Sequence, residues 1–121
     1  MKKLIAYDLG TGGIKASLFS EKGTSLADVF IQYDTLFGAE HFVEQRPMDW
    51  WNHVCTATRQ LLASSNSTAS EIAGVALSGH SLVAVPISRD GKLLAEQEKD
   101  VVRFKVFYRK ADRGMILGNC F

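Results

Sequence analysis

The sequence predicts an α/β fold with a mixed sheet, in which three antiparallel strands come first and a helix and a buried parallel strand follow. Three observations support this prediction. Apolar residues alternate with polar ones through much of residues 4–33, a helical period of apolar residues begins at Pro47, and residues 72–77 form a short, continuous apolar run. A run of that last kind is typical of a central strand that is buried on both faces.

Length and charge place the chain among ordinary globular domains. Its 121 residues are enough for one domain with its own core, and the net charge of +1 argues against a general nucleic-acid or membrane binder. Residues 101–121 carry five of the 14 basic residues and one of the 13 acidic ones, so a basic tail follows a mildly acidic body. No run approaches the roughly 20 apolar residues of a membrane helix. With only Cys55 and Cys120, we expect reduced thiols and a cytoplasmic location.

The first predicted turn combines a carboxylate with several glycines. An apolar strand delivers Asp8 to a turn formed by Gly10, Thr11, Gly12 and Gly13. Glycine allows positive φ and close approach of a ligand to the backbone, so successive N–H groups can converge on a phosphate. The neighbouring carboxylate would repel that phosphate unless a divalent cation lay between them, and Mg²⁺ is the most suitable one. Asp8 is therefore predicted to bind a metal-nucleotide complex.

Two other phosphate loops are excluded. A Walker loop requires Lys directly after Gly, whereas Lys15 follows Ile14, and Lys15 also occupies the position of the third glycine of a dinucleotide fingerprint. Residues 14–19 alternate with the period of a strand, so the turn is expected to join two antiparallel strands. The alternative is an ordinary Gly-rich hairpin whose Asp only accepts local hydrogen bonds.

The remaining elements follow in order. Residues 20–23 predict a tight turn, residues 25–33 a third strand, and residues 34–46 a long irregular connection. Pro47 then begins a helix that ends in the polar residues 64–68. Its buried face has helical spacing and consists of Trp50, Val54, Ala57 and Leu61.

A second candidate site follows the apolar strand at residues 72–77. This strand leads into Ser78, Gly79, His80 and Ser81, and ligands in open α/β sheets favour such strand ends. His80 has two interpretations, a structural hydrogen bond or a substrate contact, and no metal-ligand spacing supports zinc. Residues 82–87 are expected to form another strand and residues 88–92 a turn. On the helix, Trp50 is expected in the core and Trp51 in the wall of a cleft, because adjacent helical residues point about 100° apart.

The order of these pieces is specific. The chain begins with an Asp-x-Gly-Thr-Gly-Gly hairpin and a third antiparallel strand. Two further segments follow, first Val43-Glu44-Gln45-Arg46-Pro47-Met48-Asp49-Trp50-Trp51 and then Ile72-Ala73-Gly74-Val75-Ala76-Leu77-Ser78-Gly79-His80-Ser81. Residues 3 to about 95 thereby resemble the N-terminal domain of FGGY-family carbohydrate kinases, and the xylulokinase-like branch is nearest.

The resemblance implies an actin-like, ribonuclease H-like lobe that holds half of a site for transfer of a phosphoryl group from ATP to a sugar or polyol hydroxyl. It assigns Mg²⁺ to Asp8. It assigns the nucleotide phosphates to Gly10, Thr11, Gly12, Gly13 and, by proximity, Lys15. It assigns the sugar to the loop of Ser78, Gly79, His80, Ser81 and Leu82. To this loop we add Trp51, which the helical spacing places in the wall of a cleft.

Two departures from the family pattern are visible. Xylulokinases usually carry Gln-Met-His-Gly after the glycine, whereas this chain has His80-Ser81-Leu82-Val83, so the sugar is not specified. From Glu96 onward the expected Trp, Asp and Arg-Ala segment is not found. We therefore expect a lobe at residues 1–95 and a divergent basic tail at residues 96–121. One interpretation is that the tail arises from a frameshift, an expression artefact or a divergent ending. The other is that it is an ordinary basic helix or strand that packs on the lobe.

The family's catalytic aspartate is expected beyond this chain, so the lobe alone is predicted to be inactive and to need a C-terminal kinase lobe as its partner. Two alternatives have different consequences. The first is a non-catalytic lobe that binds sugar or nucleotide, or that forms a homodimer through an exposed cleft face. The second is another actin-like ATPase, which the match at Ser78 to Leu82 disfavours.

Overall fold

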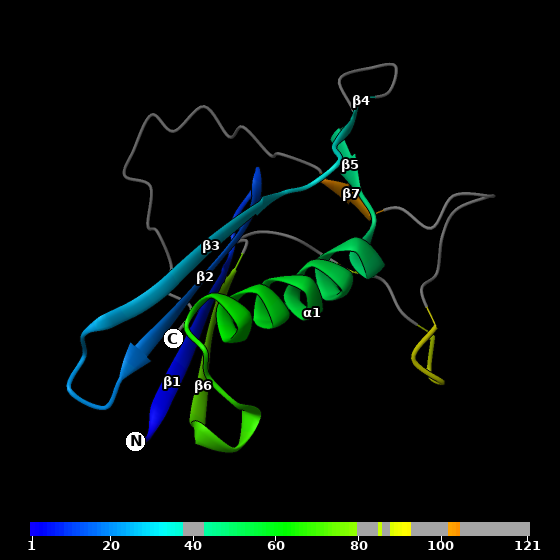
Figure 1. Ribbon diagram of the computed structural model, residues 1–121. Helices are drawn as coiled ribbons and strands as arrows, with labels where there is room; N and C mark the ends of the chain where they lie inside the picture. The colour runs from blue at the N-terminus through cyan, green and yellow to red at the C-terminus, as the bar shows by residue number, and fades with distance from the viewer. Residues whose placement is uncertain (38–42, 80–84, 86–87, 93–101, 105–121) are drawn as a thin grey trace, which may run out of the picture.

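A computed structural model describes residues 1–37, 43–79, 85, 88–92 and 102–104 (Figure 1). These residues form one long helix, one 3-10 turn and two small sheets. No helix among them is long and apolar enough to cross a membrane. The strands are β1 (Lys3–Leu9), β2 (Gly13–Ser20), β3 (Ser25–Gln32), β4 (Leu36–Phe37), β5 (Val43–Gln45), β6 (Ile72–Gly79) and β7 (Val102–Phe104).

The larger sheet has the mixed topology that the sequence predicts. Its strand order is β3-β2-β1-β6, with β1, β2 and β3 antiparallel and β6 parallel to β1. The turn between β2 and β3 is closed by the bond from the Gly23 amide to the Ser20 carbonyl, 2.9 Å long, and Gly23 has a φ of 80°. Glycine adopts that left-handed conformation without a steric penalty, so the predicted tight turn is confirmed.

Helix α1 (Pro47–Ser64) lies across one face of this sheet (Figure 1). It begins at Pro47 as predicted and packs against β2 and β3. Alternate residues of β1 and β2 point toward it, because successive side chains of a strand lie on opposite faces. The buried core between helix and sheet consists of Ile5, Tyr7, Ile14, Ala16, Leu18, Tyr33, Ala57 and Leu61.

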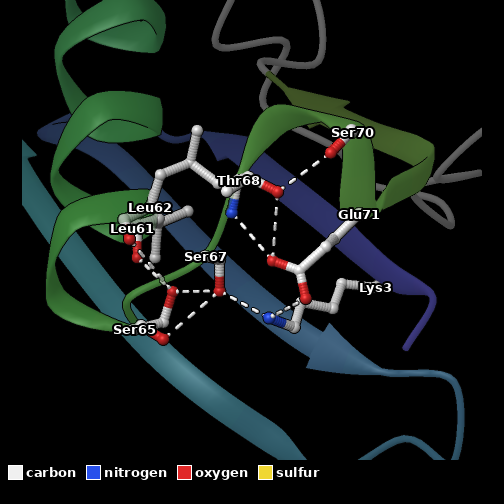
Figure 2. Close-up of polar contacts among 8 residues, drawn as sticks. All are labelled: Lys3, Leu61, Leu62, Ser65, Ser67, Thr68, Ser70 and Glu71. Carbon is white, nitrogen blue, oxygen red and sulfur yellow. Dashed lines mark hydrogen bonds and ion pairs between the residues drawn. The ribbon is translucent and has the colours of Figure 1, made fainter.

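A polar cluster fastens the start of β6 to the start of β1 (Figure 2). The buried ammonium of Lys3 lies 2.9 Å from a carboxylate oxygen of Glu71 and donates a hydrogen bond of 2.7 Å to the Ser67 hydroxyl. The other Glu71 oxygen accepts the Thr68 amide at 2.8 Å, which forms a capping box on the 3-10 turn η2 (Ala69–Glu71). Because the backbone amide and Lys3 both favour the charged carboxylate, the pKa of Glu71 falls from 4.5 to about 2.

Strand β6 differs from its prediction. Within the part of the chain that the structure describes it is an edge strand, and the side chains of Val75 and Leu77 are 64% and 71% exposed. The prediction of burial on both faces is therefore wrong for these residues. The physical reason is the position of α1, which packs on β2 and β3, so that no described element covers the β6 side of the same face.

The connection at residues 34–46 is also more regular than predicted. It contains β4 and β5, which pair antiparallel with each other, and β5 pairs in addition with β7. Strands of two or three residues show no readable alternation, and the partner of β5 is more than fifty residues away along the sequence. Such a sheet depends on long-range pairing that a local pattern does not reveal. The predicted strand at residues 82–87 lies largely outside the described residues, whereas the turn at residues 88–92 is present, with Gly91 at a φ of 81°.

Candidate functional site

Strand register brings three of the predicted site residues into one row. Asp8 on β1 pairs with Lys15 on β2 and with Ser78 on β6. Paired residues on adjacent strands share a face of the sheet, and the neighbour of Asp8, Tyr7, belongs to the core under α1. The side chains of Asp8, Lys15 and Ser78 therefore lie on the face opposite α1, and all three residues are exposed.

The glycine turn joins β1 to β2 beside this row. None of Gly10, Gly12 and Gly13 has positive φ, so the left-handed conformation that glycine allows is not used at these positions. Gly13 is buried, and a Cβ there would lie 2.4 Å from the Ile31 carbonyl oxygen and 2.7 Å from the Phe30 ring. Close packing of β2 against β3 thus requires glycine at that position.

Gly12 has the opposite environment. A Cβ at Gly12 would meet nothing within 4 Å, whereas one at Gly10 would lie 3.2 Å from the Gly13 carbonyl oxygen. Thr11 and Gly12 are both exposed at the tip of the turn. The tip is therefore the part of the turn that a ligand can approach closely.

Two carbonyl groups of the turn are held by hydrogen bonds from the protein. The Tyr33 amide donates to the Gly12 carbonyl at 3.0 Å, and the side-chain amide of Gln45 donates to the Thr11 carbonyl at 2.8 Å. In a trans peptide the C=O and the following N–H point in opposite directions. The bond from Gln45 therefore directs the Gly12 N–H away from β5.

Tyr33 and Gln45 are residues that the sequence analysis did not assign to the site. Tyr33 is buried beside the turn, and its hydroxyl has no hydrogen-bond partner among the described residues. Burial, and secondarily the negative charge of Asp8, raises the pKa of Tyr33 to about 12. A polar residue directly before the helix-starting Arg46-Pro47 pair was the one available signal for Gln45, and it fell in the segment predicted to be irregular.

Trp51 is placed on the other face of the sheet from Asp8. As predicted, Trp50 packs against the core and Trp51 is 61% exposed. The ring of Trp51 lines an apolar groove of about 730 Å³ between α1 and the β6 side of the sheet. The groove is lined by Tyr7, Leu9, Pro47, Trp50, Trp51, Val54, Cys55, Thr58, Arg59, Val75 and Leu77. Trp51 and Asp8 are thus not brought together.

The described residues include only the start of the predicted sugar loop. Ser78 and Gly79 end β6, beside Asp8 and Leu9 respectively, while His80, Ser81 and Leu82 lie outside the described residues. The start of this loop therefore lies at the same end of the sheet as the glycine turn.

The described side chains around Asp8 fit a hydrated cation. No group of three or more His, Cys, Asp or Glu residues suited to a metal occurs in the described ranges. Magnesium usually keeps several waters and takes one or two carboxylates together with substrate phosphates. An exposed carboxylate beside an open turn, with a lysine opposite it, suits that type of binding.

Comparison with known proteins agrees with these observations. Residues 3–97 match the N-terminal domain of the FGGY family of carbohydrate kinases. The chain is 29% identical over 108 residues to the xylulose kinase of Bacillus subtilis, a match that covers 89% of this chain and 20% of that protein. It is 26% identical over 82 residues to the glycerol kinase of Leifsonia xyli, a match that covers 68% of this chain and 16% of that protein. The crystal structure of a xylulose kinase from Brucella ovis superposes with a TM-score of 0.72 at 28% identity, over 77% of this chain and 20% of that one.

The chain thus spans about a fifth of the length of these two xylulose kinases. The matched region includes the hairpin, α1 and β6, so the resemblance seen in the motifs and the actin-like, ribonuclease H-like fold that it implies are confirmed. The chain belongs to the FGGY family of carbohydrate kinases and carries the N-terminal domain of that family.

Proposed function

We propose that this chain supplies the metal-nucleotide half of a kinase that transfers the γ-phosphoryl group of ATP to a hydroxyl of a sugar or polyol. The observation that carries this proposal is the row of Asp8, Lys15 and Ser78 across three neighbouring strands. It joins the predicted nucleotide turn and the start of the predicted sugar loop at one end of one sheet. Phosphoryl transfer requires these two ligands to be held side by side, because its catalysis is mainly positioning and charge stabilisation.

Each residue has a distinct role in this proposal. Asp8 would hold Mg²⁺, which would offset the negative charge of the ATP phosphates. Lys15, opposite Asp8, adds a positive charge beside the phosphates. The Gly12 N–H donates to a phosphate oxygen at the open tip of the turn. Ser78 and Gly79 begin the loop that contacts the sugar, and the proton of the sugar hydroxyl is taken by an aspartate in the part of the kinase that this lobe does not supply.

The substrate class follows from the relatives. Two similar proteins are named as xylulose kinases and one as a glycerol kinase, which supports a ketose or a polyol as acceptor. The departure from the xylulokinase pattern at residues 80–83 affects this loop directly, so the two acceptor types need to be tested side by side.

Nucleotide binding is the first test. The chain is titrated with MgATP while the backbone amides are followed by NMR, and the amides of Thr11 and Gly12 are expected to shift most. Asp8→Asn is expected to abolish the dependence of binding on Mg²⁺, with Asp28→Asn, an exposed carboxylate on β3, as the control. Equal binding with and without Mg²⁺ in the wild-type chain would contradict the proposed role of Asp8.

Turnover is the second test. The chain alone is expected to phosphorylate neither xylulose nor glycerol. Mixing it with the C-terminal part of the Bacillus subtilis xylulose kinase is expected to restore ATP-dependent phosphorylation of one of the two. Continued inactivity of a mixture that forms a stable complex would count against a kinase role.

A second function is favoured by one observation, the exposed apolar face of β6 beside the α1 groove. In that case the lobe acts as a non-catalytic module that docks a partner or a second copy through this face. Light scattering at micromolar concentration separates the two functions. A monodisperse monomer that binds MgATP supports the kinase lobe, and a dimer that binds no nucleotide supports the docking module.

A further inference from the structure

Gln45 is a buried amide whose hydrogen-bonding groups are all occupied. Only 2% of the residue is exposed. Its Nε2 donates to the Thr11 carbonyl at 2.8 Å and to the Thr35 hydroxyl at 2.9 Å, and its Oε1 accepts the Trp50 indole N–H at 2.9 Å. The orientation of the amide is fixed by chemistry, because the indole N–H is only a donor and a carbonyl is only an acceptor.

This one side chain links three segments that are separated in the sequence. It extends from β5 and contacts the tip of the glycine turn at Thr11, the segment before β4 at Thr35, and the first turn of α1 at Trp50. The bond from the Trp50 indole ties the amide to α1, and the Thr35 hydroxyl accepts the second of its N–H groups. The third bond then fixes the Thr11 carbonyl, which otherwise belongs to an exposed tip.

The orientation of the Thr11–Gly12 peptide has a chemical consequence. Its C=O points to Gln45, so its N–H points to the other side. Gly12 itself is exposed, and the space where a side chain would project from it is open. If this peptide rotated, its carbonyl oxygen would face an approaching phosphate and repel it. A fixed peptide therefore presents a donor and removes an acceptor at the same position, which is how preorganised sites favour anions.

We propose that Gln45 is a positioning residue for nucleotide binding, which holds the Thr11–Gly12 peptide so that the Gly12 N–H faces the phosphates of MgATP. The inference rests on the proposed function, because it assigns those phosphates to the glycine turn. A glutamine suits this role where a glutamate does not. A carboxylate could still accept the Trp50 N–H, but it would offer no hydrogen to the Thr11 carbonyl and would place a negative charge behind the phosphate site.

The experiment compares two variants that disturb the same cluster in different places. Gln45→Met keeps the volume and removes all three bonds, including the one to the turn. Thr35→Val removes only the bond between Gln45 and Thr35 and leaves the turn bond intact. Circular dichroism and thermal unfolding measure the cost to the fold, and NMR titration with MgATP measures the dissociation constant and the shift of the Gly12 amide in the full 121-residue chain.

The expected result is a split between affinity and stability. Gln45→Met is expected to weaken MgATP binding about tenfold or more, the effect of losing one oriented bond to a charged group. It is also expected to move the Gly12 amide resonance before any nucleotide is added. Thr35→Val is expected to lower the melting temperature as well, while it changes the MgATP dissociation constant less than about twofold. If Gln45→Met does not fold, Gln45→Glu, which retains the bond to Trp50, takes its place.

Three outcomes would overturn the inference while leaving the proposed function in place. Wild-type affinity in the folded Gln45 variant would show that the turn needs no support from this side chain. Equal loss of affinity in Thr35→Val would show that the effect is general destabilisation. Failure of both Gln45 variants to fold would assign the residue to the fold rather than to the turn. If the wild-type chain itself binds no MgATP, the proposed function falls and this inference with it, so that failure is distinguished by the wild-type titration alone.

Discussion

Two strands of the same sheet, β2 and β6, have similar apolar content and opposite environments. Leu18 on β2 is fully buried under α1, whereas Leu77 on β6 is 71% exposed. Both leucines point to the face on which α1 lies, since Leu18 belongs to the core and Leu77 lines the groove beside the helix. Apolar composition therefore indicates that a strand is suited to burial, and the position of the covering helix decides which strand receives it.

The same difference separates the region that stabilises this lobe from the surface that is available for binding. The core between α1 and β1, β2 and β3 is made by the described residues themselves. The apolar groove between α1 and β6 is left open within the same residues. We expect substitutions in the first region to change the free energy of unfolding and those in the second to change association.

Truncating the two leucines tests this comparison most strongly. Leu18→Ala removes a fully buried side chain and is expected to cost about 2–5 kcal/mol of unfolding free energy, because a cavity remains. Leu77→Ala is expected to cost no more than about 0.5 kcal/mol, because that side chain is largely in water already. Urea unfolding of both variants measures the difference. A cost for Leu77→Ala equal to that of Leu18→Ala would mean that β6 is covered in solution.

Two glycines of the turn, Gly13 and Gly12, show the same contrast between a packed and an open environment. Gly13→Ala would place a Cβ 2.4 Å from the Ile31 carbonyl oxygen, so β2 and β3 must separate, at an expected cost of about 1–3 kcal/mol. Gly12→Ala meets open space and is expected to change stability by less than about 0.5 kcal/mol. Its effect should instead be on MgATP, because the methyl group occupies the approach to the turn. Thermal unfolding and NMR titration of both variants separate the two effects, and loss of stability in Gly12→Ala would show that the tip is packed.

Local sequence patterns predicted the parts of this fold whose partners are close along the chain. The alternation on β1 and β2, the turn at Gly23 and the helix start at Pro47 are set by neighbouring residues, and the structure contains each of them. The pairing of β5 with β7 depends on residues far apart in the sequence, so no local period reveals it.

The candidate site likewise has residues that local patterns place and residues that depend on distant segments. Asp8 and Lys15 lie on the two strands of one hairpin, so local alternation places them on one face, and the short turn sets their register. Gln45 reaches the turn only because β5 lies beside it, and the length of residues 34–46 gives no indication of that contact. Side chains that position a site from a distant segment are therefore the part that a single sequence reveals least.

A smaller effect of opposite sign is expected at Tyr33. Its buried hydroxyl has no hydrogen-bond partner in the part of the chain that the structure describes, so Tyr33→Phe is expected to raise the unfolding free energy by about 1 kcal/mol. The difference in unfolding free energy between Tyr33→Phe and the wild-type chain should increase above pH 10. The pKa of Tyr33 is raised to about 12 in the folded chain, so the tyrosine ionises first in the unfolded chain and this favours unfolding of the wild type. Urea unfolding at pH 7 and pH 10.5 checks both statements. A destabilised Phe variant would indicate that the hydroxyl is satisfied by water.

The smallest expected effect concerns the link that fastens the exposed strand to the buried ones. The pKa of Glu71 is lowered to about 2 from 4.5, first by the Thr68 amide and then by Lys3. A carboxyl with a lowered folded-state pKa contributes stability that is fully present above pH 4.5 and is lost as the pH falls toward 2. Glu71→Gln is therefore expected to be less stable than the wild-type chain at pH 7 and to approach it below pH 3, with Glu21→Gln, an exposed turn residue, as the matched control. A stability difference that stays constant from pH 7 to pH 2 would mean that the Glu71 carboxylate plays no part in holding β6 against β1. The exposed edge would then depend on the backbone ladder between these two strands.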